Sequence, residues 1–438
     1  MQIRLWLVTL AFGAMPAFAD SIDMTRYLAT FAADAPALTR HSFRAVPGTA
    51  QLLVDDATAR LASLTLNGKP LAARTAEISL MANNTLEVQL SETPGQVGIR
   101  IKQTADVELH VESRIHFNTN VSDFDAARAF YGKLGFETLS GFPDTNTLEM
   151  AQAIGIDTPT EYDGSQGEAA GGYLLHGELI GVNGNSGGLI DLIEFTIPRR
   201  ETPPYANINH LGMASAAMLT ADLDTDMAAM RAAGIAFVGP AATGADGRRF
   251  AVFKDLDGTL YELIEAEGEP DADSPTHIFA LGHVRINVSD FERSASWYRM
   301  LGFELTTMLP EQESAAVGRA FGFDGPIQVK AGRFTHPIDG SELLIAQWLT
   351  PYDGDPPYSV PVNHFGIHRM AFTSTDIEAD VAQLKAQGVE FISPITPCCS
   401  GPDSWGGIVA FYDPDGTVME LADQPLMNIM MRILRWFS

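Results

Sequence analysis

The sequence contains little cysteine and few basic residues. Its 438 residues include two cysteines, the adjacent Cys398 and Cys399. Neighbouring cysteines rarely bridge to each other without strain, so a disulfide framework is excluded. The 28 basic residues stand against 55 acidic ones, which gives a net charge of −27. Such a chain repels phosphate backbones and anionic membranes, so we expect no nucleic-acid partner.

Long apolar runs are also missing beyond the first residues. No later segment reaches the roughly 18 apolar residues of a membrane-spanning helix, so we expect none in the mature chain. Residues 1–19 are typical of a signal peptide, because Arg4 precedes a short apolar run and Ala17-Phe18-Ala19 forms a small-x-small cleavage site. A retained anchor is the alternative. This start predicts export to a periplasmic or secreted location.

The remaining sequence is ordinary for a globular protein, with 46% hydrophobic residues and a length that suggests two or three domains. Residues 20–112 alternate between apolar and polar, with turn signals at Asn67-Gly68 and Pro94-Gly95. Alternation with tight turns predicts antiparallel strands. We therefore expect a small, sandwich-like all-β domain here.

An internal repeat is the strongest signal in the chain. HFNTNVSDFDAARAFYGKLGFE (116–137) matches HVRINVSDFERSASWYRMLGFE (283–304) in identical register, and DLDGTLYEL (255–263) matches DPDGTVMEL (413–421). A third pair, at 203–212 and 356–366, shares Pro-Pro-Tyr and Asn-His-x-Gly. Two homologous modules follow. Their expected limits are 113–267 and 278–424, with an acidic linker at 268–277 and a C-terminal amphipathic helix at 425–438.

Each module also repeats its own pattern of strands and helices, which predicts four βαβββ units. An aspartate stands at each expected helix start, where a carboxylate caps free N–H groups, and a glycine follows each expected end. The expected helices span 123–134, 223–233, 290–301 and 376–387, with shorter ones at 145–154 and 311–321.

These motifs resemble the vicinal oxygen chelate superfamily, which includes glyoxalase I, extradiol dioxygenases and bleomycin-resistance proteins. The resemblance covers about 310 residues and rests on the His-x5-Ser-Asp-Phe helix with LGFE, the 363–391 segment and DPDG-x3-Glu. It implies an α+β fold of two tandem modules, in which paired βαβββ units form cupped sheets. It specifies the fold far better than the activity.

In that family, ligands of a metal ion enter each cup from its first and last strands. The resemblance implies one slot seven residues before the helix-starting Asp and another four residues after the Gly of the DPDG turn. Module one then offers His116, Asp191 and Glu262, with Ser215 in the fourth slot. Such a set would suit a divalent Fe, Mn, Ni or Zn ion and no nucleotide.

Module two fills the same slots less completely. His283 and Glu420 match, Leu343 or Leu344 takes the third slot, and Arg369 takes the fourth. Because a guanidinium stays protonated, we expect Arg369 to face the same cup as His283 and to pair with Glu420.

The resemblance leaves two classes of function open. As an enzyme, the protein would be a metal-dependent lyase or isomerase that chelates neighbouring oxygens of a small substrate, with Glu262 and Glu420 as catalytic bases. Extradiol dioxygenase activity is a weaker variant. As a binder, it would sequester a small molecule. Four residues are expected at the substrate: Arg369, His364, His210 and Tyr412. A homodimer remains open.

Overall fold

The structure is a computed structural model, and it describes residues 20–31, 37–44, 48–71, 74–81, 83–107, 109–141, 148–156, 174–197, 199–311, 313–397 and 407–423. The predicted signal peptide, the C-terminal amphipathic helix, Cys398 and Cys399 lie outside these residues. Within the described part, no helix is long and apolar enough to cross a membrane.

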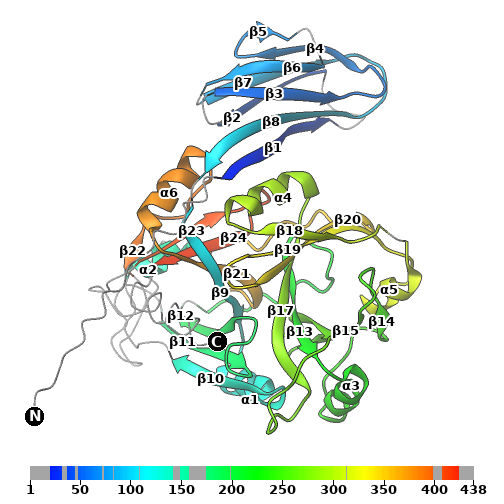
Figure 1. Ribbon diagram of the computed structural model, residues 1–438, viewed down its shortest axis with the longest axis vertical. Coiled ribbons are helices and arrows are strands. Elements are labelled where there is room, and N and C mark those ends of the chain that lie inside the picture. Colours follow the sequence, from blue (N-terminus) through cyan, green and yellow to red (C-terminus); the bar gives the residue numbers. More distant parts are fainter. Residues whose placement is uncertain are drawn as a thin grey trace, which may run out of the picture.

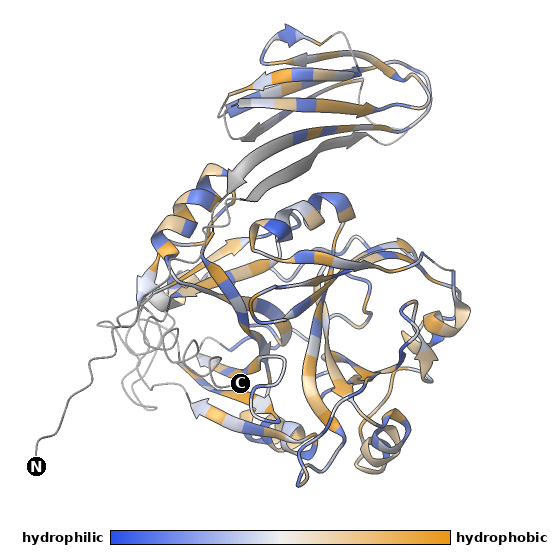
Figure 2. Ribbon diagram, viewed as in Figure 1, coloured by the Kyte–Doolittle hydropathy of each residue, from blue (hydrophilic) through white to orange (hydrophobic). Residues whose placement is uncertain are grey.

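The N-terminal region is a sandwich of two four-stranded antiparallel sheets, as the alternation predicts (Figure 1). Alternating apolar residues of both sheets, among them Leu52, Leu86 and Ile99, pack into one core. Figure 2 shows this alternation along the strands. One sheet contains β1 (Asp20–Phe31), β8 (Val97–Val107), β3 (Gly48–Asp55) and β6 (Thr75–Leu80), and the other β2 (Leu38–Arg44), β7 (Asn83–Leu90), β4 (Leu61–Leu66) and β5 (Lys69–Pro70).

Of the two predicted turns, one joins paired strands and the other joins strands of different sheets. Asn67 and Gly68 both adopt positive φ, 51° and 74°, and join β4 to β5 as a tight hairpin. The Pro94-Gly95 segment, in contrast, connects strands of opposite sheets, because β7 and β8 do not pair. Alternation identified these strands, but it could not assign them to a sheet.

Two eight-stranded sheets follow, and each takes one βαβββ unit from each module. The first cupped sheet has the order β10 (Phe136–Gly141), β11 (Leu174–Val182), β12 (Leu189–Ile197), β9 (Val111–Asn120), β21 (Gly366–Ser374), β24 (Val418–Asp423), β23 (Gly407–Tyr412) and β22 (Thr396–Pro397). The second has β14 (Ala242–Thr243), β15 (Arg249–Lys254), β16 (Leu260–Glu265), β13 (Gly212–Thr220), β17 (Ile278–Asn287), β20 (Glu342–Thr350), β19 (Gln328–Thr335) and β18 (Glu304–Met308).

This arrangement corrects the expectation that each module closes a cup of its own. The antiparallel pairs β9–β21 and β13–β17 join the modules, and each runs along the middle of its sheet. The first cup therefore combines the start of module one with the end of module two. The second cup combines the inner halves of both.

The four predicted helices of the units are confirmed to within one residue at each end, and the two shorter ones begin three or four residues later than expected. The four helices of the units are α1 (Phe124–Lys133), α3 (Leu223–Ala232), α4 (Phe291–Met300) and α6 (Ile377–Ala386). Each begins after an aspartate whose side chain accepts a backbone N–H of the first turn. The shorter helices are α2 (Leu148–Ala153) and α5 (Ala315–Ala320), and α4 lies beneath β1 of the sandwich (Figure 1).

The repeated motifs meet at one place in each module. In module two, Asp413 accepts backbone N–H groups of Asp415 and Thr417 at 2.9 and 2.8 Å, which closes the turn before β24. The Tyr298 hydroxyl of α4 donates to the same carboxylate at 2.9 Å. Tyr131 of α1 makes the equivalent 3.1 Å contact with Asp255. These residues fix the strand that carries the last-slot glutamate, which explains their recurrence.

Candidate functional site

The first cup gathers five polar side chains from four strands. His116 and Asn118 come from the same face of β9, because residues two apart in a strand point the same way. Asp191 lies on β12 beside Asn118, Arg369 pairs with Asn118 across the β9–β21 ladder, and Glu420 lies on β24. All but His116 are fully buried, and His116 is nearly so.

Arg369 occupies the centre of this group. Its Nε lies 3.2 Å from Glu420 Oε2 and donates to Asn118 Oδ1 at 3.1 Å, and its Nη2 lies 3.8 Å from Asp191 Oδ2. The predicted Arg369–Glu420 proximity is therefore confirmed. The partner histidine was wrong, because Arg369 shares its cup with His116 and not with His283.

The carboxyls of the first cup bind protons more tightly than usual. Burial raises the pKa of Asp191 to about 8 and Glu420 adds to this rise, although Arg369 opposes it. Burial also raises the pKa of Glu420, against the effect of Arg369. Burial and the neighbouring guanidinium lower the pKa of His116 to about 3. The positive charge of Arg369 thus offsets the negative charge of one carboxylate, and His116 stays neutral.

Three buried atoms in the first cup that could bind a metal ion make no hydrogen bond. They are His116 Nδ1, Asp191 Oδ1 and Glu420 Oε2, the last being close to Arg369 without the required geometry. An imidazole and two carboxylates suit a divalent first-row ion in donor type. Their positions fit less well, because the guanidinium already lies against both carboxylates, and the described residues contain no group of three or more ligands placed to hold a metal ion.

The second cup has the same positions filled differently. Glu262 of β16, Ser215 of β13 and His283 of β17 take the slots of Glu420, Arg369 and His116. Leu344 of β20 replaces Asp191, and Arg285 replaces Asn118. Glu262 is thereby separated from His116 and Asp191, with which it was expected to form one site.

Arg285 neutralises the glutamate of the second cup. Its Nε and Nη2 donate to Glu262 Oε1 and Oε2 at 2.7 and 2.8 Å, and Ser215 Oγ donates to Oε1 at 2.7 Å. Burial alone would raise the pKa of Glu262, but Arg285 and the nearby His283 hold it well below its usual value. Both oxygens already accept hydrogen bonds from a fixed cation. The second cup therefore does not fit a metal ion.

His283 lies beside this ion pair without joining it. Its Nε2 is 3.6 Å from Glu262 Oε1, too long for a hydrogen bond, and both ring nitrogens are buried without a hydrogen-bond partner. Burial lowers its pKa, so the ring is neutral at ordinary pH. A neutral imidazole offers one donor and one acceptor.

A cavity of about 110 Å³ lies beside Glu262, His283 and Arg285. The module-one loop 244–248 and the module-two elements α5, β19 and β20 surround it. Its apolar walls include Phe250, Ile264, Val317, Phe321, Ile327 and Leu344, and its polar lining consists of Glu262, His283, Arg285, Asp246, Arg248, Arg333 and Ser314.

The remaining predicted residues lie elsewhere. His210 lies in a module-one loop and His364 in a module-two loop, and the two loops pack together. Tyr205 and Tyr358 of these loops stack with ring centroids 4.9 Å apart, and each histidine packs on the tyrosine of its own loop. His368 faces Asn120 in the first cupped sheet, with its Nε2 3.1 Å from the amide nitrogen. Tyr412 is half buried at the end of β23 against an apolar cluster. The expected contact of His210, His364 and Tyr412 with substrate stays a prediction.

Sequence reasoning missed Arg285, Asn118 and the arginines around the cavity. Arg285 could have been found, because it stands two residues after His283 and alternation places both on one face. Arg248 and Arg333 carried no such signal. They lie far apart in the sequence and meet only because the modules interleave.

Two solved structures show what this chain is similar to. Glyoxalase I from Zea mays is 17% identical, with 74% of this chain and 96% of that one covered at a TM-score of 0.49. A glyoxalase family protein from Bacillus cereus is 23% identical over 33% of this chain and 92% of its own, at a TM-score of 0.30. No curated protein matches the chain.

The family model provides the assignment. The model of the Glyoxalase/Bleomycin resistance protein/Dioxygenase superfamily matches residues 114–263 and 280–421, more than half of the chain. These two matches coincide with the repeated modules whose units build the cupped sheets. The chain therefore belongs to the Glyoxalase/Bleomycin resistance protein/Dioxygenase superfamily.

Proposed function

We propose that this protein binds a small molecule in its second cup without a metal ion. The observation that carries the proposal is the two-pronged pair between Arg285 and Glu262. A planar guanidinium matches a carboxylate with two parallel hydrogen bonds, so the pair is strong and geometrically fixed. Arg285 also lies over the ring of Phe321 at 5.1 Å, which holds its side chain in place.

The cavity beside this pair has the features of a ligand site. Its walls are mainly apolar, while a few polar groups converge on it, among them the unpartnered ring of His283. Glu262 is not free to accept a proton from a substrate, because its low pKa and three donors keep it ionised and occupied. The second cup is therefore built to hold a molecule rather than to transfer its proton.

Binding of butyramide tests this proposal. Butyramide is neutral and small enough for the cavity, and calorimetric titration with excess EDTA should detect a single site. Val317→Trp should abolish binding, because Val317 lines the cavity and a larger side chain would fill it. Ala316→Trp is the matched control, since Ala316 is exposed on the same helix. Binding to the wild type of neither butyramide nor its carboxylate analogue butyrate, or binding that requires a divalent ion, would overturn the proposal.

A second candidate function is favoured by the first cup. We propose that His116, Asp191 and Glu420 are the residues that would hold one divalent ion if Arg369 withdrew from the two carboxylates that it contacts, because each has a buried nitrogen or oxygen atom without a hydrogen-bond partner. Such an ion would supply Lewis-acid chemistry for a lyase or isomerase reaction. Asn118 and Arg369 would orient these ligands, and Arg369 would in addition oppose the ion's charge. This candidate and the metal-free second cup are compatible.

A further inference from the structure

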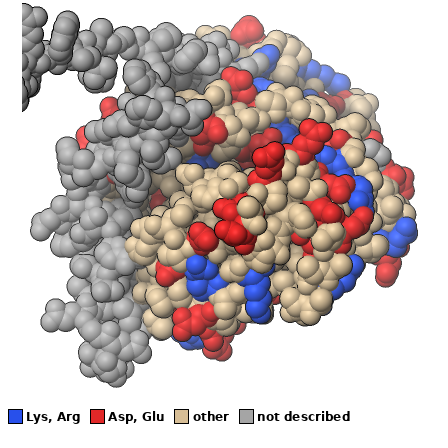
Figure 3. All heavy atoms as spheres, turned by 60° about the horizontal axis from the view of Figure 1, so that its bottom comes forward, with Lys and Arg blue, Asp and Glu red and all other residues tan. Residues whose placement is uncertain are grey.

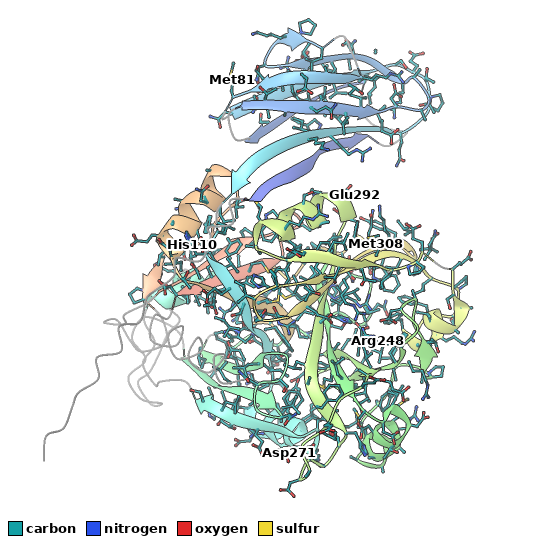
Figure 4. All side chains as sticks on the ribbon, viewed as in Figure 1. Met81, His110, Arg248, Asp271, Glu292 and Met308 are labelled. Carbon is teal, nitrogen blue, oxygen red and sulfur yellow. The ribbon has the colours of Figure 1, made fainter. Side chains whose placement is uncertain are left out.

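We propose that the ligand of the second cup is a small monocarboxylate bound by Arg248 and Arg333. This inference rests on the proposed function of that cup. Arg248 stands in the loop between β14 and β15 of module one, and Figure 4 labels it there. Arg333 comes from β19 of module two, and both line the cavity.

Asp246 holds the two guanidinium groups together. Its Oδ2 accepts Arg248 Nε at 2.8 Å and Arg333 Nη2 at 2.7 Å. Arg248 Nη2 and Arg333 Nε are buried without a hydrogen-bond partner. Arg333 Nη1 lies 3.8 Å from Glu342 Oε2, beyond hydrogen-bond distance. Two guanidinium groups that line one cavity thus have N–H donors that the described residues leave unused.

The charge of the cavity lining also calls for an anion. Three guanidinium groups, those of Arg248, Arg285 and Arg333, face two carboxylates, those of Asp246 and Glu262. His283 adds no charge because it is neutral. The groups that line the cavity therefore leave one positive charge, and Glu342, outside the lining and 3.8 Å from Arg333 Nη1, offsets it only in part because its side chain is partly exposed. A buried charge is expensive unless it is paired, and a carboxylate of one negative charge would pair it.

The size of the cavity limits the rest of the ligand. An apolar cavity of about 150 Å³ accommodates benzene, so one of about 110 Å³ holds no more than about six non-hydrogen atoms. The apolar walls suit a short hydrocarbon body. Short-chain carboxylates such as butyrate meet both requirements.

Butyrate and butyramide form a matched pair for the test. They have the same shape, but only butyrate carries a charge. Calorimetric titration with EDTA present should show butyrate binding about 10- to 100-fold more tightly, the range expected for hydrogen bonds to a charged group. Arg248→Met and Arg333→Met should each reduce this preference about tenfold or more, and each leaves Asp246 paired with the other arginine. Arg249→Met is the control, because Arg249 does not line the cavity and instead contacts Asp224 and Glu265.

The outcomes separate this inference from the function on which it rests. Equal binding of both compounds, or a preference that neither arginine variant changes, would overturn the carboxylate inference and leave the binding cavity intact. Binding of neither compound would overturn both. Because the preference is a ratio within one variant, a general loss of stability cannot imitate it.

Discussion

Both cups bury a glutamate that needs a counter-charge, but the arginine that supplies it lies on a different strand in each cup. A glutamate on the last strand is buried in each, and an arginine reaches it in each. In the first cup that arginine is Arg369 on β21, whereas in the second it is Arg285 on β17. The two positions face each other across the central ladders, as the pairs Arg369–Asn118 and Ser215–Arg285 show. A buried carboxylate needs a counter-charge, and either side of the ladder can supply it.

Removal of Arg285 should show how much this ion pair contributes to stability. Arg285→Met would leave Glu262 buried without its counter-charge and should lower the free energy of unfolding by about 3–5 kcal/mol near pH 7. The loss should be smaller near pH 5, since the unpaired carboxyl can then be protonated. Arg285→Met combined with Glu262→Gln is the control and should recover much of the loss. Urea unfolding measures both, and a single variant as stable as the wild type would contradict the account.

Asp191 should make the first cup sensitive to alkaline pH. Its pKa in the folded chain, about 8, lies above the value of 3.8 expected when unfolded, so the folded state binds its proton more tightly. The stability contributed by this group is complete below the unfolded pKa and is lost as the pH rises through the folded one. Asp191→Asn cannot ionise and should therefore be more stable than the wild type at about pH 9.

The same comparison has a built-in control at low pH. Near pH 4 the folded Asp191 is protonated and similar in shape to asparagine, and the unfolded chain has only begun to gain from its ionisation, so the two proteins should unfold at similar urea concentrations. Metal-free buffer is needed, because a bound ion would favour the ionised carboxylate. A difference in stability that stays constant from pH 4 to pH 9 would show that Asp191 does not titrate as described.

At the scale of elements, the helices were predictable and the strand partners were not. Asp123, Asp222, Asp290 and Asp376 each cap a helix where the sequence indicated, because a cap is a local signal. The pairing of β9 with β21 has no such local signal in the sequence. Both modules carry the same His and Glu motifs, so either partner would fill the same slots. The grouping of His116 with Glu262 failed for this reason.

Cleavage of the chain between the modules tests the interleaved sheets. A protease site inserted near Asp271–Asp273, in the exposed connection between β16 and β17, should yield two parts that stay together during size-exclusion chromatography. The β9–β21 and β13–β17 ladders hold them. Separation should require denaturant. Two folded parts that separate in native buffer would show that each module closes its own cup.

At the scale of the whole molecule, acidic residues outnumber basic ones by 55 to 28. The net charge is −27, and Figure 3 shows acidic and basic side chains interspersed over the face that it presents. We propose that the protein is exported. The support is the sequence of residues 1–19, in which Arg4 precedes a short apolar run and Ala17-Phe18-Ala19 forms a small-x-small cleavage site.

Intact-mass measurement of the protein from its native host tests export. The mature chain should lack residues 1–19 and begin at Asp20. Substitution of Ala19 by a bulky residue such as Ala19→Trp should block processing, because the peptidase requires a small residue there. A mature protein that begins at Met1 would contradict export with cleavage.

The central claim is that an arginine has taken the place of a metal ion in the second cup. Metal analysis after incubation with manganese, iron, nickel or zinc tests it most directly. The account predicts at most one ion per chain, which His116→Ala removes and His283→Ala leaves unchanged. Two ions per chain, or an ion that His283→Ala removes, would contradict it.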